Sequence, residues 1–287
     1  MTSILNYKKL MQNIGTTNFK KHTLFVCLLC ILVLIGVSRN GFAAPPAEVQ
    51  WQPVLQLSDE FDKFDALKWN NYHPGWKGRT PSHFLKENVF VEDGKLCLRS
   101  TSKVASLSEV KNVTDDVWVN SAAVSSKKKI AQPGYYYETS IKASDLSMTS
   151  SFWFRMGRFS EIDVIENIGR PENPAKRHFE TQMKMNTHLY REDPKISTPH
   201  DYDMEMRSRD HFIVYGLWWK SPNEIIFYCN DKPVQTVIPQ KPFDEPLHMI
   251  FDTEVFTWVG FPTIESLNNP SCNTMYVDWV RTWKPVE

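Results

Sequence analysis

Short runs in which apolar and polar residues alternate recur along the chain from about residue 51 onward. The clearest is 182–189, where Met183, Met185 and Leu189 fall on one side of an extended strand and polar residues on the other. Other runs are rich in the aromatic and β-branched residues that strands prefer. Strands are therefore predicted at 88–91, 95–98, 134–143, 151–154, 162–166, 181–189, 213–219, 224–228, 248–251 and 275–280.

Turn signals separate these strands. Asp93-Gly94 predicts a tight hairpin between 88–91 and 95–98, and Ser221-Pro222-Asn223 marks another turn. No long segment keeps the 3.6-residue apolar period of a helix, so few helices are expected. Many strands with few helices predict an all-β sandwich or barrel. Because no linker or repeat interrupts it, 51–287 is predicted to be one domain.

The first 43 residues have a different character. They contain five basic residues and no acid, an apolar run of fourteen residues at Leu24–Val37, and small residues up to Ala43. This pattern predicts a secretory signal peptide over 1–43, followed by a short leader over 44–50. The alternative is an uncleaved membrane anchor, but a spanning helix needs roughly 20 apolar residues. We therefore expect a secreted or periplasmic protein that is free of the membrane after cleavage.

The charge of the chain changes once this segment is removed. The whole sequence has 33 basic and 33 acidic residues, and loss of the five N-terminal bases leaves 28 against 33, a net charge of −5. An acidic domain argues against a nucleic-acid partner. The three remaining cysteines, Cys97, Cys229 and Cys272, allow at most one internal disulfide. A monomer is expected.

The sharpest chemical feature is the segment Ser160–Asn167. Glu161, Asp163 and Glu166 alternate there with aliphatic residues. In a regular strand Glu166 would face away from the other two, but a β-bulge between Asp163 and Glu166 would bring all three to one face. Three carboxylates on one face repel each other, so they indicate shared protons or a catalytic use. The alternative is that the three acids lie on a solvent-exposed edge of the sheet. Such an edge does not require the aliphatic residues that stand between the acids and would be buried on the reverse face.

Two carboxyl groups across a glycosidic bond support hydrolysis with retention of configuration. In this hypothesis Glu161 attacks the anomeric carbon and Glu166 protonates the leaving oxygen, then deprotonates water. Asp163 shares a proton with Glu161 and orients it. No cofactor is expected for catalysis.

At this point the sequence resembles glycoside hydrolase family 16 in its bulged E-x-D-x-x-E form. The similarity extends from about Ser58 to Lys284: Asp59–Asp62 with Leu67–Trp69 resembles the family's opening strand, and Gly134–Ala143 and Val277–Arg281 resemble later ones. The resemblance implies a jelly-roll β-sandwich with a concave substrate cleft.

Within the family, the chain is most similar to β-agarases and β-porphyranases. The segments that carry this similarity are Trp76–Pro81, Asn186–His188 and Phe251–Gly260. The resemblance implies that a polysaccharide substrate is contacted by Trp76, Arg79, Trp153, Asn186, His188, Glu254 and Trp258. For Trp279 and Trp283 we expect core packing instead. The family also implies a structural calcium ion held by a carbonyl near Gly94 and by the Asp278 carboxylate.

The leading hypothesis is a secreted endo-acting β-agarase. Basic segments at Arg155–Phe159, Lys176-Arg177 and Arg191 would also suit sulfate esters, which keeps a β-porphyranase or another sulfated-galactan or laminarin hydrolase open. The net charge of −5 weighs slightly toward neutral agarose through long-range repulsion. A galactan-binding lectin without turnover is the alternative from another class, although a lectin has no use for three crowded carboxylates.

Overall fold

The computed structural model describes residues 45–286, so the predicted signal peptide over 1–43 lies outside the described residues. Strands dominate this part of the chain, and it contains a single α-helix, α2 (Ile264–Asn268). Short 3-10 helices connect several strands: η1 (Leu55–Leu57), η2 (Lys86–Asn88), η3 (Leu107–Glu109), η4 (Pro174–Thr181) and η5 (Thr257–Val259). None of the described helices is long and apolar enough to cross a bilayer.

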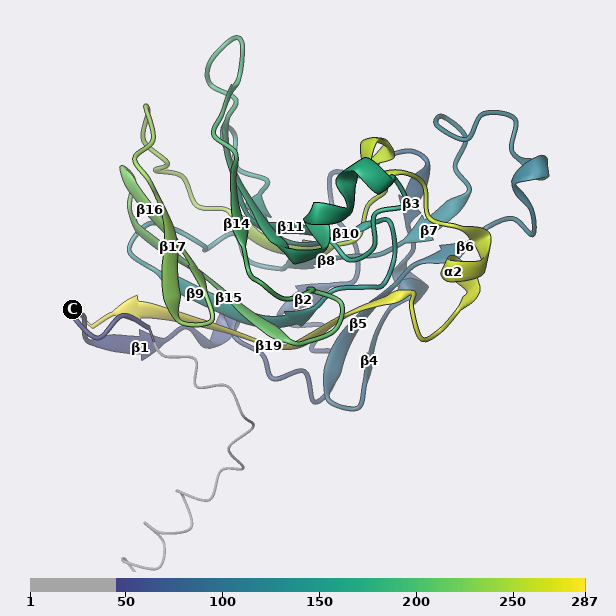
Figure 1. Cartoon of the computed structure of the whole chain (residues 1–287). Helices are drawn as coiled ribbons and strands as arrows, with labels where there is room; N and C mark the ends of the chain where they lie inside the picture. The colour runs from purple at the N-terminus through teal and green to yellow at the C-terminus, as the bar shows by residue number, and fades with distance from the viewer. Residues whose placement is uncertain (1–44, 287) are drawn as a thin grey trace, which may run out of the picture. The chain divides into compact units, whose positions relative to one another are not determined.

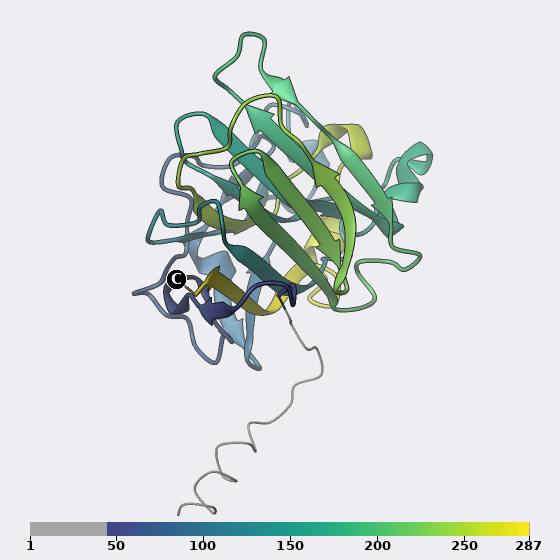
Figure 2. The same cartoon turned by 90° about the vertical axis from the view of Figure 1, so that its left-hand side faces the viewer.

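Two large antiparallel sheets form the body of the fold (Figures 1 and 2). The first, here called the outer sheet, has the strand order β17-β16-β15-β9-β19-β5-β4, with β1 beside β19. Its strands are β1 (Trp51–Pro53), β4 (Val89–Glu92), β5 (Lys95–Arg99), β9 (Tyr136–Lys142), β15 (Ile213–Ser221), β16 (Glu224–Cys229), β17 (Lys232–Val237) and β19 (Thr274–Pro285).

The second sheet, here called the cleft sheet, has the order β13-β12-β11-β10-β18-β8-β2, with β14 beside β12. Its strands are β2 (Trp69–Asn70), β8 (Ala123–Ser126), β10 (Thr149–Arg155), β11 (Ser160–Ile168), β12 (Gln182–Leu189), β13 (Ile196–Ser197), β14 (His200–Asp203) and β18 (His248–Asp252). A small third sheet joins β3 (Ser82–Phe84), β6 (Thr101–Ser102) and β7 (Val119–Ser121).

The main apolar core is built from residues of both large sheets. Phe152 of β10 and Phe251 of β18 stack with ring centroids 5.0 Å apart, and Tyr137 of the outer sheet packs 4.7 Å from Phe154. Burial of such rings supplies the main driving force for folding. The all-β sandwich is therefore confirmed, and each of the ten strands predicted between residues 88 and 280 from residue pattern overlaps an observed one. Trp279 is buried, as expected for a packing role.

The β4–β5 hairpin also follows the prediction. Val89 to Glu92 pair with Leu98 to Lys95, and the two turn residues between them, Asp93 and Gly94, have φ of 51° and 66°. Positive φ at both positions is the geometry of the type I′ turn that Asp-Gly favours.

The predicted opening strand, 59–62 with 67–69, is observed only at its end, where Trp69 begins β2, and is wrong at 59–62. Asp59 forms only an isolated bridge with Val280, and Phe61 has a φ of 52°, which interrupts an extended chain. The Asp59 carboxylate explains the turn, because Oδ1 accepts a hydrogen bond from the Phe61 N–H and Oδ2 accepts one from the Trp69 indole. Short acidic side chains such as Asp often accept hydrogen bonds from backbone N–H groups close by in the sequence. Those N–H groups are then not available for pairing in a sheet.

Candidate active site

A β-bulge at Val164 brings the three acids of β11 to the same cleft. Trp153 of β10 pairs with Asp163, whereas the adjacent Phe152 pairs with Ile165, so Val164 has no partner on β10. The extra residue resets the alternation of side chains before Glu166. The bulge predicted between Asp163 and Glu166 is therefore confirmed.

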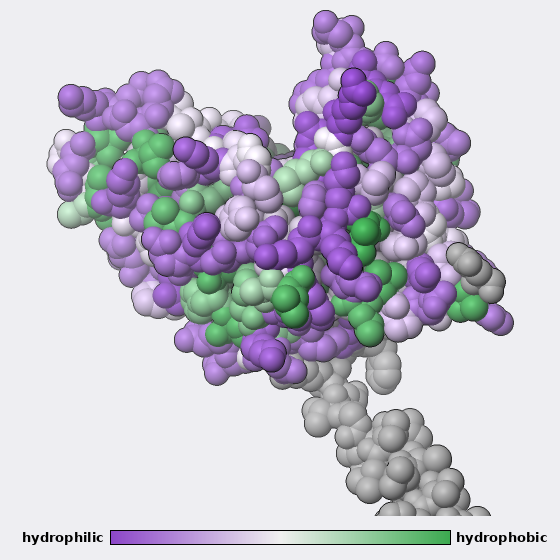
Figure 3. All heavy atoms as spheres, turned by 180° about the vertical axis from the view of Figure 1, so that it is seen from behind, coloured by the Kyte–Doolittle hydropathy of each residue, from purple (hydrophilic) through white to green (hydrophobic). Residues whose placement is uncertain are grey.

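The cleft has a volume of about 470 Å³, and Figure 3 shows the molecular surface hollowed at its upper edge. It is lined by acids of β11 and β18, by two arginines and by aromatic side chains. The lining residues are His73, Gly75, Trp76, Arg79, Ser151, Trp153, Arg155, Met156, Gly157, Glu161, Asp163, Glu166, Tyr190, Asp252 and Glu254. An apolar wall with a few convergent polar groups is typical of a ligand site.

Glu161 is held by one side chain from β10 and by one from the residue that follows β12. Arg155 Nε lies 2.8 Å from Glu161 Oε2, and the Tyr190 hydroxyl donates to the same carboxylate at 3.3 Å. The guanidinium also lies 3.7 Å from the centroid of the Tyr190 ring. The ion pair and the hydrogen bond together hold the carboxylate in one position, as a nucleophile requires.

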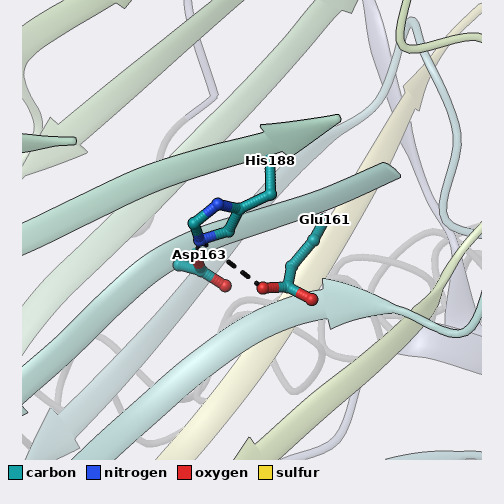
Figure 4. Close-up of side chains that lie close together, drawn as sticks. All are labelled: Glu161, Asp163 and His188. Carbon is teal, nitrogen blue, oxygen red and sulfur yellow. Dashed lines mark ion pairs between the residues drawn. The ribbon is translucent and has the colours of Figure 1, made fainter. Parts of the chain in front are cut away.

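Asp163 lies beside Glu161 and beneath the ring of His188 (Figure 4). His188 Nε2 is 3.3 Å from Asp163 Oδ2 and 3.6 Å from Glu161 Oε1. Burial and the nearby Glu161 charge raise the pKa of Asp163 well above its usual range, and burial lowers the pKa of His188. These shifts favour a proton on Asp163, between two otherwise repelling carboxylates, and favour the neutral imidazole.

The Nδ1 atom of His188 lies 2.7 Å from Ser197 Oγ, a contact that fixes the orientation of the ring. The donor atoms of Glu161, Asp163 and His188 all lie within 4.8 Å of one another. Among the described residues, this is the one group of three such side chains that is spaced to hold a metal ion.

Glu166 lies two residues beyond the bulged Val164, opposite Ser151 of β10. Burial, followed by the charges of Asp163 and Glu254, raises its pKa well above the usual range, and Arg79 opposes that shift. A carboxyl group that keeps its proton near neutral pH is suited to general acid catalysis. Glu161 and Glu166 therefore sit in contrasting environments, as the two catalytic carboxyls of a glycosidase require.

Strand β18 adds two further buried acids. Asp252 pairs with Ser151, so it lies across β10 from Glu166, and burial raises its pKa well above the usual range. Glu254 follows the strand and accepts a hydrogen bond from Arg79 Nε at 3.0 Å. The guanidinium of Arg79 also lies 5.1 Å from the centre of the Phe256 ring.

Aromatic rings form one wall of the cleft. His73 stacks on Trp153 with centroids 5.9 Å apart and an interplanar angle of 14°, and Trp76 lies edge-on to both rings. Burial lowers the pKa of His73 to about 4, so this ring is neutral. Such a wall suits the apolar face of a sugar ring.

The structure places the predicted sugar contacts at different distances from the acids. Trp76, Arg79, Trp153 and Glu254 line the cleft. His188 contacts the acids directly, whereas Asn186 pairs with Asp163 across the strands and its Oδ1 accepts the Thr187 N–H at 2.9 Å. Neither Asn186 nor Trp258, on η5, belongs to the cleft lining.

Several cleft residues were not predicted as site residues: His73, Ser151, Tyr190, Asp252 and, except as part of a basic segment, Arg155. For two of them the sequence held a signal. Arg155 lies two residues after Trp153, and Tyr190 lies two residues after His188. Continuing the strand alternation by one step would have placed both on the cleft face.

The predicted calcium site is on the outer sheet. Val277 pairs with Leu96, two residues from Gly94, and the next residue, Asp278, is skipped at a register shift between β19 and β9. Calcium takes six to eight oxygen ligands, and Asp278 would supply one carboxylate beside backbone carbonyls. The calcium ion stays a prediction.

Comparison with known proteins gives a consistent result. The family profile described as "Beta-porphyranase A-D, GH16 domain" matches residues 51–285. The chain is 31% identical to β-porphyranase D of Zobellia galactanivorans, over 87% of this chain and 64% of that protein, so it spans less than two thirds of that relative's length. It is 32% identical to β-porphyranase B of Phocaeicola plebeius, over 84% of this chain and 88% of that one.

The crystal structure of porphyranase B from Zobellia galactanivorans superimposes with a TM-score of 0.74 at 29% identity, covering 87% of this chain and 98% of that one. The two-sheet fold agrees with these matches. The chain belongs to glycoside hydrolase family 16, whose jelly-roll fold it shares, and is a glycoside hydrolase.

Proposed function

We propose that this protein is a secreted, endo-acting galactanase that hydrolyses the β-1,4 linkages of a red-algal galactan with retention of configuration. The observation that carries the proposal is the pairing of an arginine-bound Glu161 with a Glu166 of raised pKa in one cleft. The two-step reaction requires one ionised and one protonated carboxyl group.

In the first step a Glu161 oxygen attacks the anomeric carbon while Glu166 donates its proton to the leaving glycosidic oxygen. The products are a covalent glycosyl ester of Glu161 and an ionised Glu166. In the second step Glu166 removes a proton from water, and the water oxygen displaces Glu161 from the sugar. Both carboxyl groups thereby return to their starting states.

Asp163 and His188 act on the nucleophile instead of the substrate. The proton held by Asp163 stabilises Glu161 as negative charge returns to it, and Ser197 holds the imidazole in place above both. Arg155 and Tyr190 fix the rotamer of Glu161 from the other side. Holding the Glu161 carboxylate in the geometry in which it reacts lowers the entropic cost of reaching the transition state.

Porphyran is proposed as the preferred polymer, ahead of the agarose that the net charge favoured. The family profile and both sequence relatives above are those of β-porphyranases, which supports this change. Salt screens the diffuse net charge over roughly 10 Å at 0.1 M, so long-range repulsion is a weak argument for agarose.

The test is a reducing-sugar assay on porphyran, agarose, carrageenan and laminarin with wild type, Glu161→Gln and Glu166→Gln. We expect cleavage of porphyran and loss of at least about 10³-fold in kcat in each variant, since both remove a reacting group. NMR of the first product should show the β-anomer. Turnover that survives Glu161→Gln would remove the nucleophile assignment, and binding of every polymer without turnover would support a lectin.

A further inference from the structure

The turn between β10 and β11 is closed by a side chain from a distant part of the chain. The backbone N–H groups of Arg158, Phe159 and Ser160 all donate to the carboxylate of Glu245, each at 2.6 Å. Oε1 accepts two of these hydrogen bonds and Oε2 accepts the third. Hydrogen bonds to an ionised carboxylate are roughly twice as strong as those between neutral groups. One side chain therefore fixes the three residues that immediately precede Glu161.

Two features of the turn let the carboxylate come this close. Gly157 has no side chain, and a Cβ atom at this position would lie 2.6 Å from Glu245 Cδ. Met156 has a φ of 66°, so the chain reverses through the left-handed region just before the glycine. Although burial raises the pKa of Glu245, the hydrogen bonds from the three N–H groups bring it below its usual value. The turn is therefore shaped to accept an ionised carboxylate.

Glu245 is carried by a segment that is fixed on both sides. The buried Phe243 donates its N–H to the carbonyl of Pro222, in the β15–β16 hairpin, at 2.8 Å. The buried Leu247 exchanges two backbone hydrogen bonds with Ala131, at 2.7 and 3.1 Å. A side chain on a rigid base can hold the group that it binds in one place. The position of the β10–β11 turn is therefore set from outside β10 and β11.

The two side chains that hold Glu161, Arg155 and Tyr190, are here called the Glu161 clamp, and both rest on this turn. The Tyr190 N–H donates to the Phe159 carbonyl at 2.7 Å. Arg155 Nη1 donates to the Ser160 carbonyl at 3.3 Å, while its Nε is paired with Glu161. Phe159 and Ser160 thus bind the clamp through their carbonyl groups, and their N–H groups are held by the distant carboxylate.

From this chain of contacts we propose that Glu245 is a positioning residue for the reaction, whose carboxylate fixes the β10–β11 turn and thereby places the Glu161 clamp on the nucleophile. The inference rests on the proposed function, because Glu245 is not part of the cleft lining and acts only through Glu161. Without it, Arg155 and Tyr190 would shift relative to the carboxylate that they hold. A displacement of a reacting group by about 1 Å can cost about 100-fold in rate.

A double-mutant cycle on kcat tests this role. In Glu245→Gln an amide NH2 replaces one accepting oxygen and faces a backbone N–H, so at least one of the three hydrogen bonds is lost. On the polymer that wild type cleaves, kcat should fall about tenfold while KM changes less than about twofold. In the Arg155→Met, Tyr190→Phe background, which lacks the clamp, the same change should lower kcat less than about twofold. Equal losses in the two backgrounds would overturn the proposal.

Glu109→Gln is the matched control. Glu109 Oε1 also accepts two backbone N–H groups, those of Ala105 and Ser106, but it lies on η3 and outside the cleft lining. This variant should keep the wild-type kcat and KM, and a similar loss of kcat in it would count against the proposal. Thermal unfolding shows whether each variant is folded. If Glu245→Gln does not fold, Glu245→Asp replaces it, because its shorter side chain keeps the charge but not the reach.

A measurement without turnover separates this role from the proposed function. The Arg155 Nε–H proton gives its own NMR signal, and it exchanges slowly with water while the guanidinium is held against Glu161. Glu245→Gln should speed this exchange about tenfold, and Glu109→Gln should leave it unchanged. If wild type cleaves no polymer but the exchange still speeds up, the proposed function fails while the positioning role stands. Unchanged exchange in Glu245→Gln would overturn the positioning role, whatever the activity.

Discussion

The guanidinium of Arg155 is clamped between the carboxylate of Glu161 and the ring of Tyr190. Its Nε lies 2.8 Å from Glu161 Oε2, its Cζ lies 3.7 Å from the Tyr190 ring centroid, and the Tyr190 hydroxyl reaches back to the same carboxylate. The three side chains come from β10, β11 and the residue after β12. This closed triangle fixes the proposed nucleophile from the side opposite Asp163.

Replacing Arg155 with Met should therefore lower kcat/KM by roughly 10- to 100-fold, since a hydrogen bond to a charged group contributes about 1.5–3 kcal/mol. Tyr190→Phe should cost less, because Arg155 keeps its ion pair. The measurement is kcat/KM on porphyran. Arg281→Met is the matched control: Arg281 Nε pairs with Glu60 at 2.8 Å on the outer sheet, and its loss should leave kcat/KM unchanged. Equal effects of the two arginine variants would contradict the clamp.

The pH dependence of activity should respond in opposite directions to changes at Arg79 and Glu254. Glu166 must be protonated to act as the acid, so activity is lost as the pH rises through its pKa. Glu254 raises that pKa and Arg79 lowers it. Glu254→Gln should thus move the alkaline limb of the kcat/KM profile to lower pH, and Arg79→Met should move it to higher pH. If the alkaline limbs of both variants moved in the same direction, the charges of Arg79 and Glu254 would not act through the pKa of Glu166.

The stability of the fold should depend on Glu138, which is buried on β9 and accepts a hydrogen bond from the Tyr136 hydroxyl at 2.8 Å. Burial raises the pKa of Glu138 from 4.5 to about 8. The folded state therefore binds a proton that the unfolded state releases above pH 4.5. The stability contributed by this group is complete below that pH and is lost as the pH rises through about 8.

Urea unfolding of wild type and Glu138→Gln at about pH 5 and about pH 8 measures this contribution. The fall in free energy of unfolding between the two pH values should be smaller in the variant, because the amide does not ionise. Other buried acids titrate equally in both proteins and cancel in the comparison. Glu87→Gln, a change at an exposed acid, should keep the wild-type pH dependence.

The core under the cleft should be sensitive to loss of Phe152, which is fully buried and stacks on Phe251. Phe152→Ala should lower the free energy of unfolding by about 3–5 kcal/mol through lost burial and a cavity. Ile238, which is 69% exposed, is the control, and Ile238→Ala should change stability by less than about 0.5 kcal/mol. Similar losses in the two variants would show that the stack does not support the sheet.

Local pattern was sufficient for much of the fold and for the centre of the site. Alternation within 182–189 correctly placed Met183 and Met185 in the core and His188 on the open face. The spacing of Glu161, Asp163 and Glu166 correctly required a bulge, because residues three apart, such as Asp163 and Glu166, point to opposite faces of a regular strand. Both inferences use only the geometry of one strand.

Local pattern failed where a side chain competes with the sheet. At 59–62, Asp59 bonds the Phe61 N–H and the Trp69 indole, and the extended run ends. The strand propensity of Phe61 and its neighbours does not indicate this turn, because the Trp69 indole that binds Asp59 lies ten residues away in the sequence. The turn depends on a contact that the sequence does not display.

Tertiary structure alone decided which charges are paired and which are free. Arg155, Lys176 and Arg191 are equally basic in the sequence, yet Glu161 neutralises the first, Asp244 lies against the last, and Lys176 stays beside Trp258. Strand alternation determines the face of each side chain, but the neighbour across the sheet depends on strand order. That order is set by the packing of the two sheets, which brings β10, β11, β12 and β18 together from positions up to about a hundred residues apart. The catalytic role of the acids could therefore be predicted from the sequence. The charges and hydrogen-bond partners around them depend on how the strands of the folded sandwich are ordered.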